Sequence, residues 1–470
     1  MEEVHLGNLG LAYFNLGEPR KAIEFYDQSL KISREIGDRH GEGNHLGNLS
    51  LAYSHLGEPR KAIEFYDQSL KISREIGDQW GEGTSLGNLG LAYFNLGEPR
   101  KAIEFYDQAL KISREIGDRR GEGNHLGNLG LAYFDLGEPC KAIEFYDQSL
   151  KISREIGDRH GEGNHLGDLG NAYSDLGEPR KAIEFFDQAL KISQEIGDRH
   201  GEGNRLSDLG LAYSDLGEPR RAIEFFDQAL KISREIEDRR GERDRLGNLG
   251  IAYSHLGEPY KAIEFYDLAL KISREIGDRR GEGASLGNLG LAYFNLGEPR
   301  KAIEFYEQAL KISQEIGNMR GEGAHLSNLG NAYSHLGVPC NAIEFYYQSL
   351  KISQEIGDQR SEGNQLGNLG LAYLCLGEPR RAIEFYDQAL KIAQEICDKR
   401  SEGNHLFNMS LSLKSLSQQE KAILMAKSAL AIFEQIESPP RRGCPQKAGR
   451  MVRLSPQASL FIHSQSCPSS

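Results

Sequence analysis

One forty-residue pattern is repeated along almost the whole chain, and it constrains the fold more than any other feature. The block at residues 81–120 reads GEGTSLGNLGLAYFNLGEPRKAIEFYDQALKISREIGDRR. The pattern recurs every 40 residues over residues 1–440, eleven times, without an insertion or deletion. A repeat array grows unit by unit and needs no single large core. We refer to a residue's place in its block as its repeat position.

Each block predicts two amphipathic helices, at about repeat positions 2–16 and 19–37. In the block at 81–120, Gly97 follows the first helix, where a left-handed cap is favoured. Pro99 then suits the first turn of the second helix. The first apolar stripe consists of Leu86, Leu89, Ala92, Tyr93 and Leu96. The second consists of Ala102, Phe105, Tyr106, Ala109, Ile112 and Ile116.

Repeat position 10 lies inside the first helix and is Gly in nine blocks and Ser in two, Ser50 and Ser410. A glycine there costs about 1 kcal/mol relative to alanine. The recurrence of glycine predicts that the backbone of a neighbouring helix packs very close to position 10. Since neither helix can bury its stripe alone, each pair must also pack against its neighbours.

The residues at these positions resemble the tetratricopeptide repeat signature. The matching residues are Leu89, Gly90, Tyr93, Gly97, Ala102, Tyr106 and Ala109. The usual unit has 34 residues, so six more lengthen the second helix and the linker. This form resembles the repeats of Pins/LGN-type adaptors and of bacterial regulatory arrays. The resemblance covers residues 1–437 and implies an all-α, right-handed superhelical solenoid of eleven helix-turn-helix repeats.

The chain divides by composition into a tetratricopeptide-like array at 1–437 and a short tail at 438–470. The last repeat is atypical, as is common where one face of an array meets water. The tail is rich in Pro and Ser and holds five basic residues and no acidic ones. We expect it to be disordered.

The resemblance implies that the first helices line a concave groove. Repeat positions 4, 8, 11 and 15 lie opposite the core stripe of that helix. Position 8 is Asn or Asp throughout: Asn8, Asn48, Asn88, Asn128, Asp168, Asp208, Asn248, Asn288, Asn328, Asn368 and Asn408. An amide both donates and accepts, so this row can pair with an extended peptide backbone. The alternative is that these side chains satisfy the backbone of a neighbouring repeat.

Positions 14 and 15 vary most between blocks, through either selection for a ligand or drift. Phe94, Phe134 and Phe294 occupy position 14, and Asp135, Asp175 and Asp215 occupy position 15. Together with Asp168, Asp208 and Asp244, these aspartates predict an acidic stretch on the groove face. A basic partner segment flanked by apolar residues would complement it. A solvated acidic surface is the alternative.

Several classes of function are excluded or disfavoured. The net charge of −13 disfavours nucleic-acid binding. No apolar run approaches the length of a bilayer span, and no signal peptide is evident. The six cysteines are scattered, which favours a reducing compartment. We therefore expect a cytoplasmic protein without membrane contact. The histidines lack zinc-ligand spacing, and the GEG sequence lacks the order of a phosphate loop. We therefore expect no metal, no cofactor and no catalytic residues.

The sequence thus predicts a non-catalytic scaffold that binds a protein or peptide in its groove. One alternative is a structural array that forms homo-oligomers by end-to-end stacking. Another is a sensor module detached from a larger signalling protein. An RNA-binding helical repeat would need a basic groove, and an enzyme is the least supported class.

Overall fold

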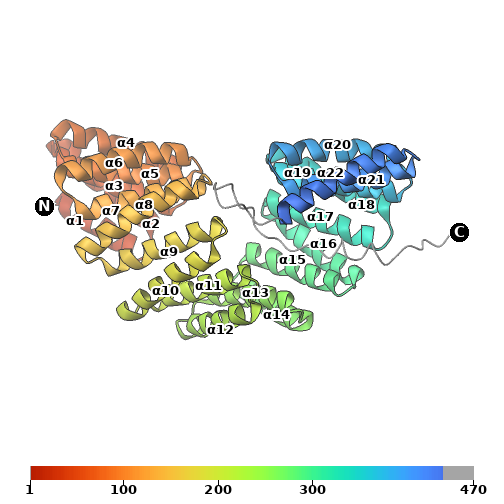
Figure 1. Ribbon diagram of the computed structural model, residues 1–470. Coiled ribbons are helices and arrows are strands. Elements are labelled where there is room, and N and C mark those ends of the chain that lie inside the picture. The colour runs from red at the N-terminus through yellow and green to blue at the C-terminus, as the bar shows by residue number, and fades with distance from the viewer. Residues whose placement is uncertain (1, 438–470) are drawn as a thin grey trace. The chain divides into compact units, whose positions relative to one another are not determined.

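The structure is a computed structural model that describes residues 2–437 (Figure 1). Over this range every regular element is an α-helix, and the 22 helices form eleven consecutive pairs. The predicted all-α repeat solenoid is therefore confirmed. Met1 and the predicted tail at 438–470 lie outside the described residues.

The odd-numbered helices are the first helices of the pairs and the even-numbered ones are the second. The first helices are α1 (Glu2–Asn15), α3 (Arg39–His55), α5 (Gln79–Asn95), α7 (Arg119–Asp135), α9 (Arg159–Asp175), α11 (Arg199–Asp215), α13 (Arg239–Leu256), α15 (Arg279–Asn295), α17 (Met319–His335), α19 (Gln359–Cys375) and α21 (Lys399–Ser415). The second helices are α2 (Pro19–Ile36), α4 (Pro59–Ile76), α6 (Pro99–Ile116), α8 (Pro139–Ile156), α10 (Pro179–Ile196), α12 (Pro219–Glu235), α14 (Pro259–Glu275), α16 (Pro299–Glu315), α18 (Pro339–Glu355), α20 (Pro379–Glu395) and α22 (Gln419–Glu437).

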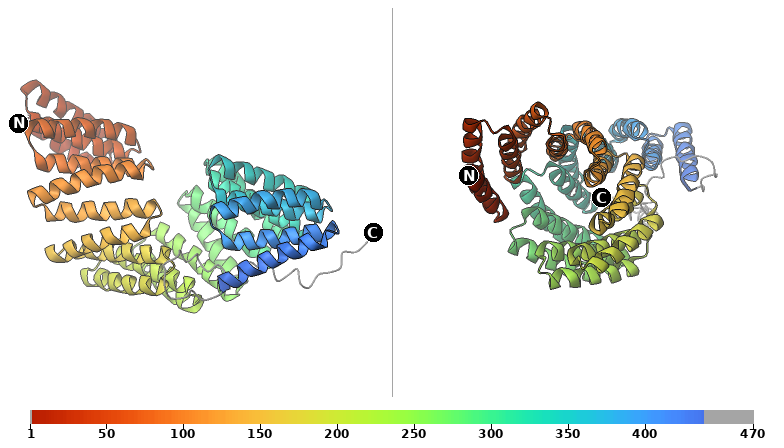
Figure 2. Two further views of the ribbon diagram at one scale, coloured as in Figure 1. Left: turned by 45° about the horizontal axis from the view of Figure 1, so that its top comes forward. Right: turned by 90° about the vertical axis from the view of Figure 1, so that its left-hand side faces the viewer.

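The described helices belong to two compact units, and the boundary between them in the sequence follows Leu216. The first unit contains α1–α11 and the second contains α12–α22. Within each unit, every helix packs against the helices before and after it in the sequence (Figure 2). In the first unit, consecutive first helices also approach one another, with Cα atoms within 8 Å. Each hairpin therefore completes the core of its neighbours, as the repeat pattern required.

Local capping chemistry sets the helix ends. From α3 on, the first helices begin three residues earlier than predicted, because Asp38 and its equivalents act as N-caps. The Asp38 carboxylate accepts a hydrogen bond from the Gly41 backbone N–H at 2.9 Å. At the other end, Gly97 has φ +76°, and the N–H of Glu98 donates to the Tyr93 carbonyl at 3.0 Å. The glycine cap and the proline start of the second helix are thus confirmed.

The left-handed cap after the second helix gives a stability prediction. Glu237 and Cys397 occupy repeat position 37 with φ +58° and +57°, whereas the other blocks up to residue 397 have Gly there. A side chain in this conformation is strained. Glu237→Gly and Cys397→Gly should each raise the free energy of unfolding by about 0.5–1 kcal/mol. Urea unfolding followed by circular dichroism measures this, and Gly117→Ala should have the opposite effect. No gain at either position would contradict the prediction.

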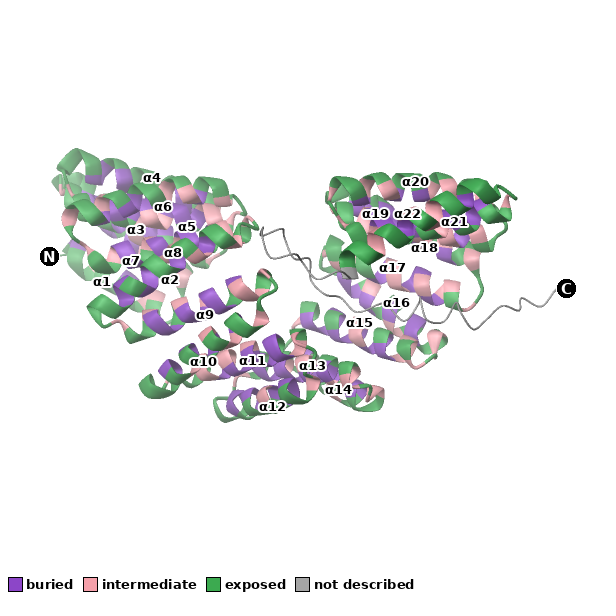
Figure 3. Ribbon diagram, viewed as in Figure 1, coloured by how far each residue is buried: buried purple, intermediate pink, exposed green. Residues whose placement is uncertain are grey.

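The predicted apolar stripes form the core, and they appear as buried bands along the helices in Figure 3. In the block at 81–120, Leu89, Ala102 and Ala109 are fully buried. The prediction about position 10 is wrong in one respect. A Cβ atom on Gly90 would lie 2.5 Å from Cε1 of Tyr106, whose ring is also buried. The glycine therefore makes room for an aromatic ring of its own hairpin and not for a helix backbone.

Candidate functional site

Buried glutamates at the block junctions hold successive hairpins together. Glu42 at the start of α3 accepts a hydrogen bond from Nε of Arg34 on α2 at 2.8 Å, and a second from Arg39. Arg39 also pairs with Glu75 on α4, so the cluster joins three helices. Burial opposes the charge on Glu42, but the two arginines outweigh it and lower the pKa of this carboxyl. The buried Glu42 carboxylate therefore serves packing between repeats.

Histidines at repeat position 5 fill a second part of the junction. The imidazole of His45 lies against Gly7 of the preceding first helix, and its Nε2 is 2.9 Å from the Ser29 hydroxyl. Where the preceding block has alanine at repeat position 29, the histidine has no such hydroxyl beside it. There, burial lowers the pKa of His125, and lowers those of His325 and His405 to about 4. Each of these three rings also has a buried nitrogen without a hydrogen-bond partner.

The position 8 residues lie half-buried on the first helices, beside the exposed surface. They are Asn48, Asn88, Asn128, Asp168, Asp208, Asn248, Asn288, Asn328 and Asn368. Within the described part of the chain, six of the amides form no hydrogen bond to another residue: Asn48, Asn88, Asn128, Asn288, Asn328 and Asn368. The alternative role, satisfying the backbone of a neighbouring repeat, finds no support at these six positions.

The acidic residues divide into compensated and exposed groups. Asp208 forms an ion pair with Arg205 at 3.2 Å, and Asp168 lies 3.7 Å from Nδ1 of His165. Both neighbours come from the same helix as the carboxylate, and the charge of Arg205 offsets that of Asp208. Asp244 belongs to the second unit and pairs with Arg243.

The three aspartates at repeat position 15 differ from these. Asp135, Asp175 and Asp215 are exposed at the ends of α7, α9 and α11. None has an ion-pair partner among residues 2–437. Since these helices are consecutive and contact one another, the first unit brings three free carboxylates onto neighbouring helices. We call this set the acidic triplet.

The position 14 phenylalanines are less available than the sequence suggested, because they contribute to packing. Phe94, Phe134 and Phe294 are half-buried. Each packs against the buried cluster that includes the second helix of its own pair. Phe294 also meets the ring of His335 edge to face at 5.3 Å. Variation at position 14 therefore changes repeat packing as well as the surface.

Sequence reasoning missed a row of exposed aliphatic side chains at repeat position 11, three residues after the amide row. The row consists of Leu11, Leu51, Leu91, Leu131, Leu211, Ile251, Leu291 and Leu411, which are 39–49% exposed. A detectable signal was present, because an aliphatic residue recurs outside the core stripe of a helix. We call these residues the leucine row.

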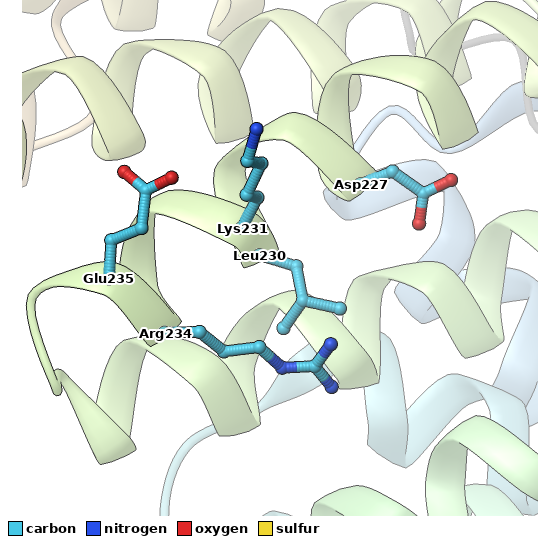
Figure 4. A pocket seen from close by; sticks show the side chains of 5 residues that line it. All are labelled: Asp227, Leu230, Lys231, Arg234 and Glu235. Carbon is cyan, nitrogen blue, oxygen red and sulfur yellow. The ribbon is translucent and has the colours of Figure 1, made fainter.

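Other features of the described chain offer no competing site. The side chains of Asp227, Leu230, Lys231, Arg234 and Glu235 line an open depression of about 410 Å³ on α12, and Figure 4 shows them spread along the helix without converging. Among residues 2–437, no group of three or more His, Cys, Asp or Glu side chains could hold a metal ion. No helix in that range is long and apolar enough to cross a membrane.

Some solved structures share this arrangement of helices. The Signal Transduction ATPase with Numerous Domains from Pyrococcus horikoshii, which has a tetratricopeptide repeat sensor, is 18% identical with a TM-score of 0.53, covering 74% of this chain and 54% of that one. This chain thus spans about half the length of that ATPase. The apo quorum sensor NprR from B. thuringiensis is 14% identical with a TM-score of 0.51, covering 77% and 99%. At this identity, the likeness concerns the fold alone.

BtubC from P. vanneervenii is 22% identical with a TM-score of 0.44, covering 50% of this chain and 99% of that one. No curated protein sequence matches this chain significantly. The tetratricopeptide repeat family model, in contrast, matches most of the chain. Its matches cover residues 2–75, 81–155, 121–195, 162–235, 246–315, 322–395 and 364–435. With matches in both units and helix pairs that follow the same period, the chain belongs to the tetratricopeptide repeat family.

Proposed function

We propose that this chain is a non-catalytic scaffold that binds a protein or peptide segment along the exposed face of its first helices. The main support for the proposal is the row of half-buried amides at position 8, six of which form no hydrogen bond within the described chain. A half-buried amide gains most from a partner that both donates and accepts, which is what an extended backbone supplies. Tetratricopeptide arrays generally serve as interaction scaffolds, which supports the same proposal.

A sensor role is the second candidate, because two of the solved neighbours are named as a sensor-bearing ATPase and a quorum sensor. It would use the same surface, with ligand binding reported to another protein or domain. The scaffold and the sensor would therefore both bind their ligand on the exposed face of the first helices.

Removing neighbouring amides tests the proposal. Asn48→Ala, Asn88→Ala and Asn128→Ala together should weaken binding to peptides selected from a displayed library of unstructured sequences by about tenfold or more, since three backbone contacts are lost. Fluorescence anisotropy with the selected peptides measures this. The control is Gln68→Ala, Gln108→Ala and Gln148→Ala, which removes three exposed amides from the second helices of the same region. Failure to select any peptide, or equal binding by the amide variant, would refute the proposal.

A further inference from the structure

The leucine row determines what kind of segment the first unit can accept. Leu51, Leu91, Leu131 and Leu211 lie on α3, α5, α7 and α11 and are 39–46% exposed. Position 11 lies three residues after the amide at position 8 and four before position 15, so all three side chains share one face of the helix. These four helices thus present a polar group for a ligand backbone next to an apolar surface for a ligand side chain, whereas α9 carries Asn171 at position 11.

The spacing of the helices favours an extended ligand. Packed helices have axes about 8–10 Å apart, and consecutive first helices in this unit do contact one another. An extended chain advances about 3.3 Å per residue and a polyproline II chain about 3.1 Å. Three residues therefore cover the distance from one first helix to the next, so side chains three residues apart meet Leu51, Leu91 and Leu131 in turn. On α9 this position is Asn171, and Leu211 on α11 continues the row one step later.

A helical ligand matches less well. Seven residues of an α-helix advance about 10.5 Å, so a side chain at every seventh position could also meet the row. The backbone of such a helix is already hydrogen-bonded internally, however. The amides of Asn48, Asn88 and Asn128 would then stay without partners, whereas an extended backbone has free N–H and C=O groups for them.

The charge of this face specifies the remaining ligand positions. In the first unit, repeat positions 4, 8, 11 and 15 include the acidic triplet and no Lys or Arg. The arginine nearest to this face, Arg205, is already paired with Asp208. A ligand with cationic residues between its apolar ones would complement the triplet and associate faster.

We infer that the first unit binds an extended peptide segment with an aliphatic residue at every third position and Lys or Arg between them. This inference rests on the proposed function and specifies its ligand.

Three synthetic peptides of identical Leu, Lys and Ser composition test the inference, with leucines spaced every third residue, every seventh residue or irregularly. We expect the full chain to bind the period-three peptide about tenfold more tightly than the others by fluorescence anisotropy. Leu91→Asn, Leu131→Asn and Leu211→Asn together should remove this preference. Asparagine already occupies position 11 at Asn171 and Asn331, so the fold tolerates it. The control is Leu268→Gln, which replaces an exposed leucine on α14 by the residue usual at its position.

Replacing Asp135, Asp175 and Asp215 with Asn should weaken binding of the period-three peptide severalfold and reduce its salt dependence. Tighter binding of the period-seven peptide, or binding that is indifferent to the leucine substitutions, would overturn the inference while leaving the amide-row proposal intact. The inference would also be overturned, and the amide-row proposal kept, if none of the three peptides binds while library peptides bind the parent chain more tightly than the amide variant. If library selection also fails, the proposed function itself is wrong.

Discussion

Glu282→Ala should lower the free energy of unfolding by about 2–3 kcal/mol, whereas Glu322→Ala should cost only about 1 kcal/mol. Glu282 is buried at the junction of two hairpins and accepts a hydrogen bond from Nε of Arg274 at 2.8 Å. It also pairs with Arg279, which in turn pairs with Glu315 on α16. Its loss would leave two guanidinium groups without their shared carboxylate. Because both arginines are about half-exposed, water offsets part of the cost.

Glu322 occupies the equivalent position with neither arginine present. Position 34 is Gln314, whose amide donates to Glu322 at 3.0 Å, and position 39 is Met319. The chain therefore provides a matched control that has the same backbone setting and one neutral donor. Urea unfolding of both variants, followed by circular dichroism, makes the comparison. Equal losses at the two sites would show that the arginine pairs contribute nothing to the junction.

Lowering the pH from 7 to 5 should destabilise the protein by about 2 kcal/mol for each of the two histidines whose pKa is lowered to about 4, His325 and His405. Burial keeps these rings neutral in the folded state, and at His405 the nearby Asp398 only partly opposes this. In the unfolded chain they bind protons below about pH 6.5. The unfolded state therefore holds more protons between about pH 4 and 6.5. This contribution to stability is complete above that window and is lost as the pH falls through it.

The pH effect can be assigned with substitutions. His325→Gln with His405→Gln should reduce the dependence of unfolding free energy on pH between 5 and 7, and His125, whose pKa burial also lowers, keeps part of it. Gln365 already occupies the same repeat position. His160→Gln, which removes an exposed histidine, should keep the parental slope. The junction glutamates do not interfere, because a lowered carboxyl pKa removes stability only below about pH 4.5. An unchanged slope in the double variant would contradict the assignment.

The sequence alone determined the repeat, the helix pairs and most of the core. Leu89, Ala102 and Tyr106 could be placed because apolar spacing within a helix is a local property, set by its 3.6-residue period. Gly97 and Pro99 marked helix ends for a similar reason, since backbone preference depends on the residue itself. The position 8 row could likewise be placed on one face by helical geometry, and its half-burial agrees with a location beside the exposed surface.

What only the tertiary structure decided are contacts between residues from different helices and blocks. Gly90 faces the Tyr106 ring on the second helix of its pair. Glu42 on α3 accepts hydrogen bonds from Arg34 on α2 and from Arg39, which also pairs with Glu75 on α4. Helical spacing alone could have paired Arg205 with Asp208, which are three residues apart, but it could not show that Arg34 on α2 meets Glu42 on α3. A pair of the second kind depends on which side chain the next hairpin brings within a few ångströms, and that is fixed only when the hairpins pack.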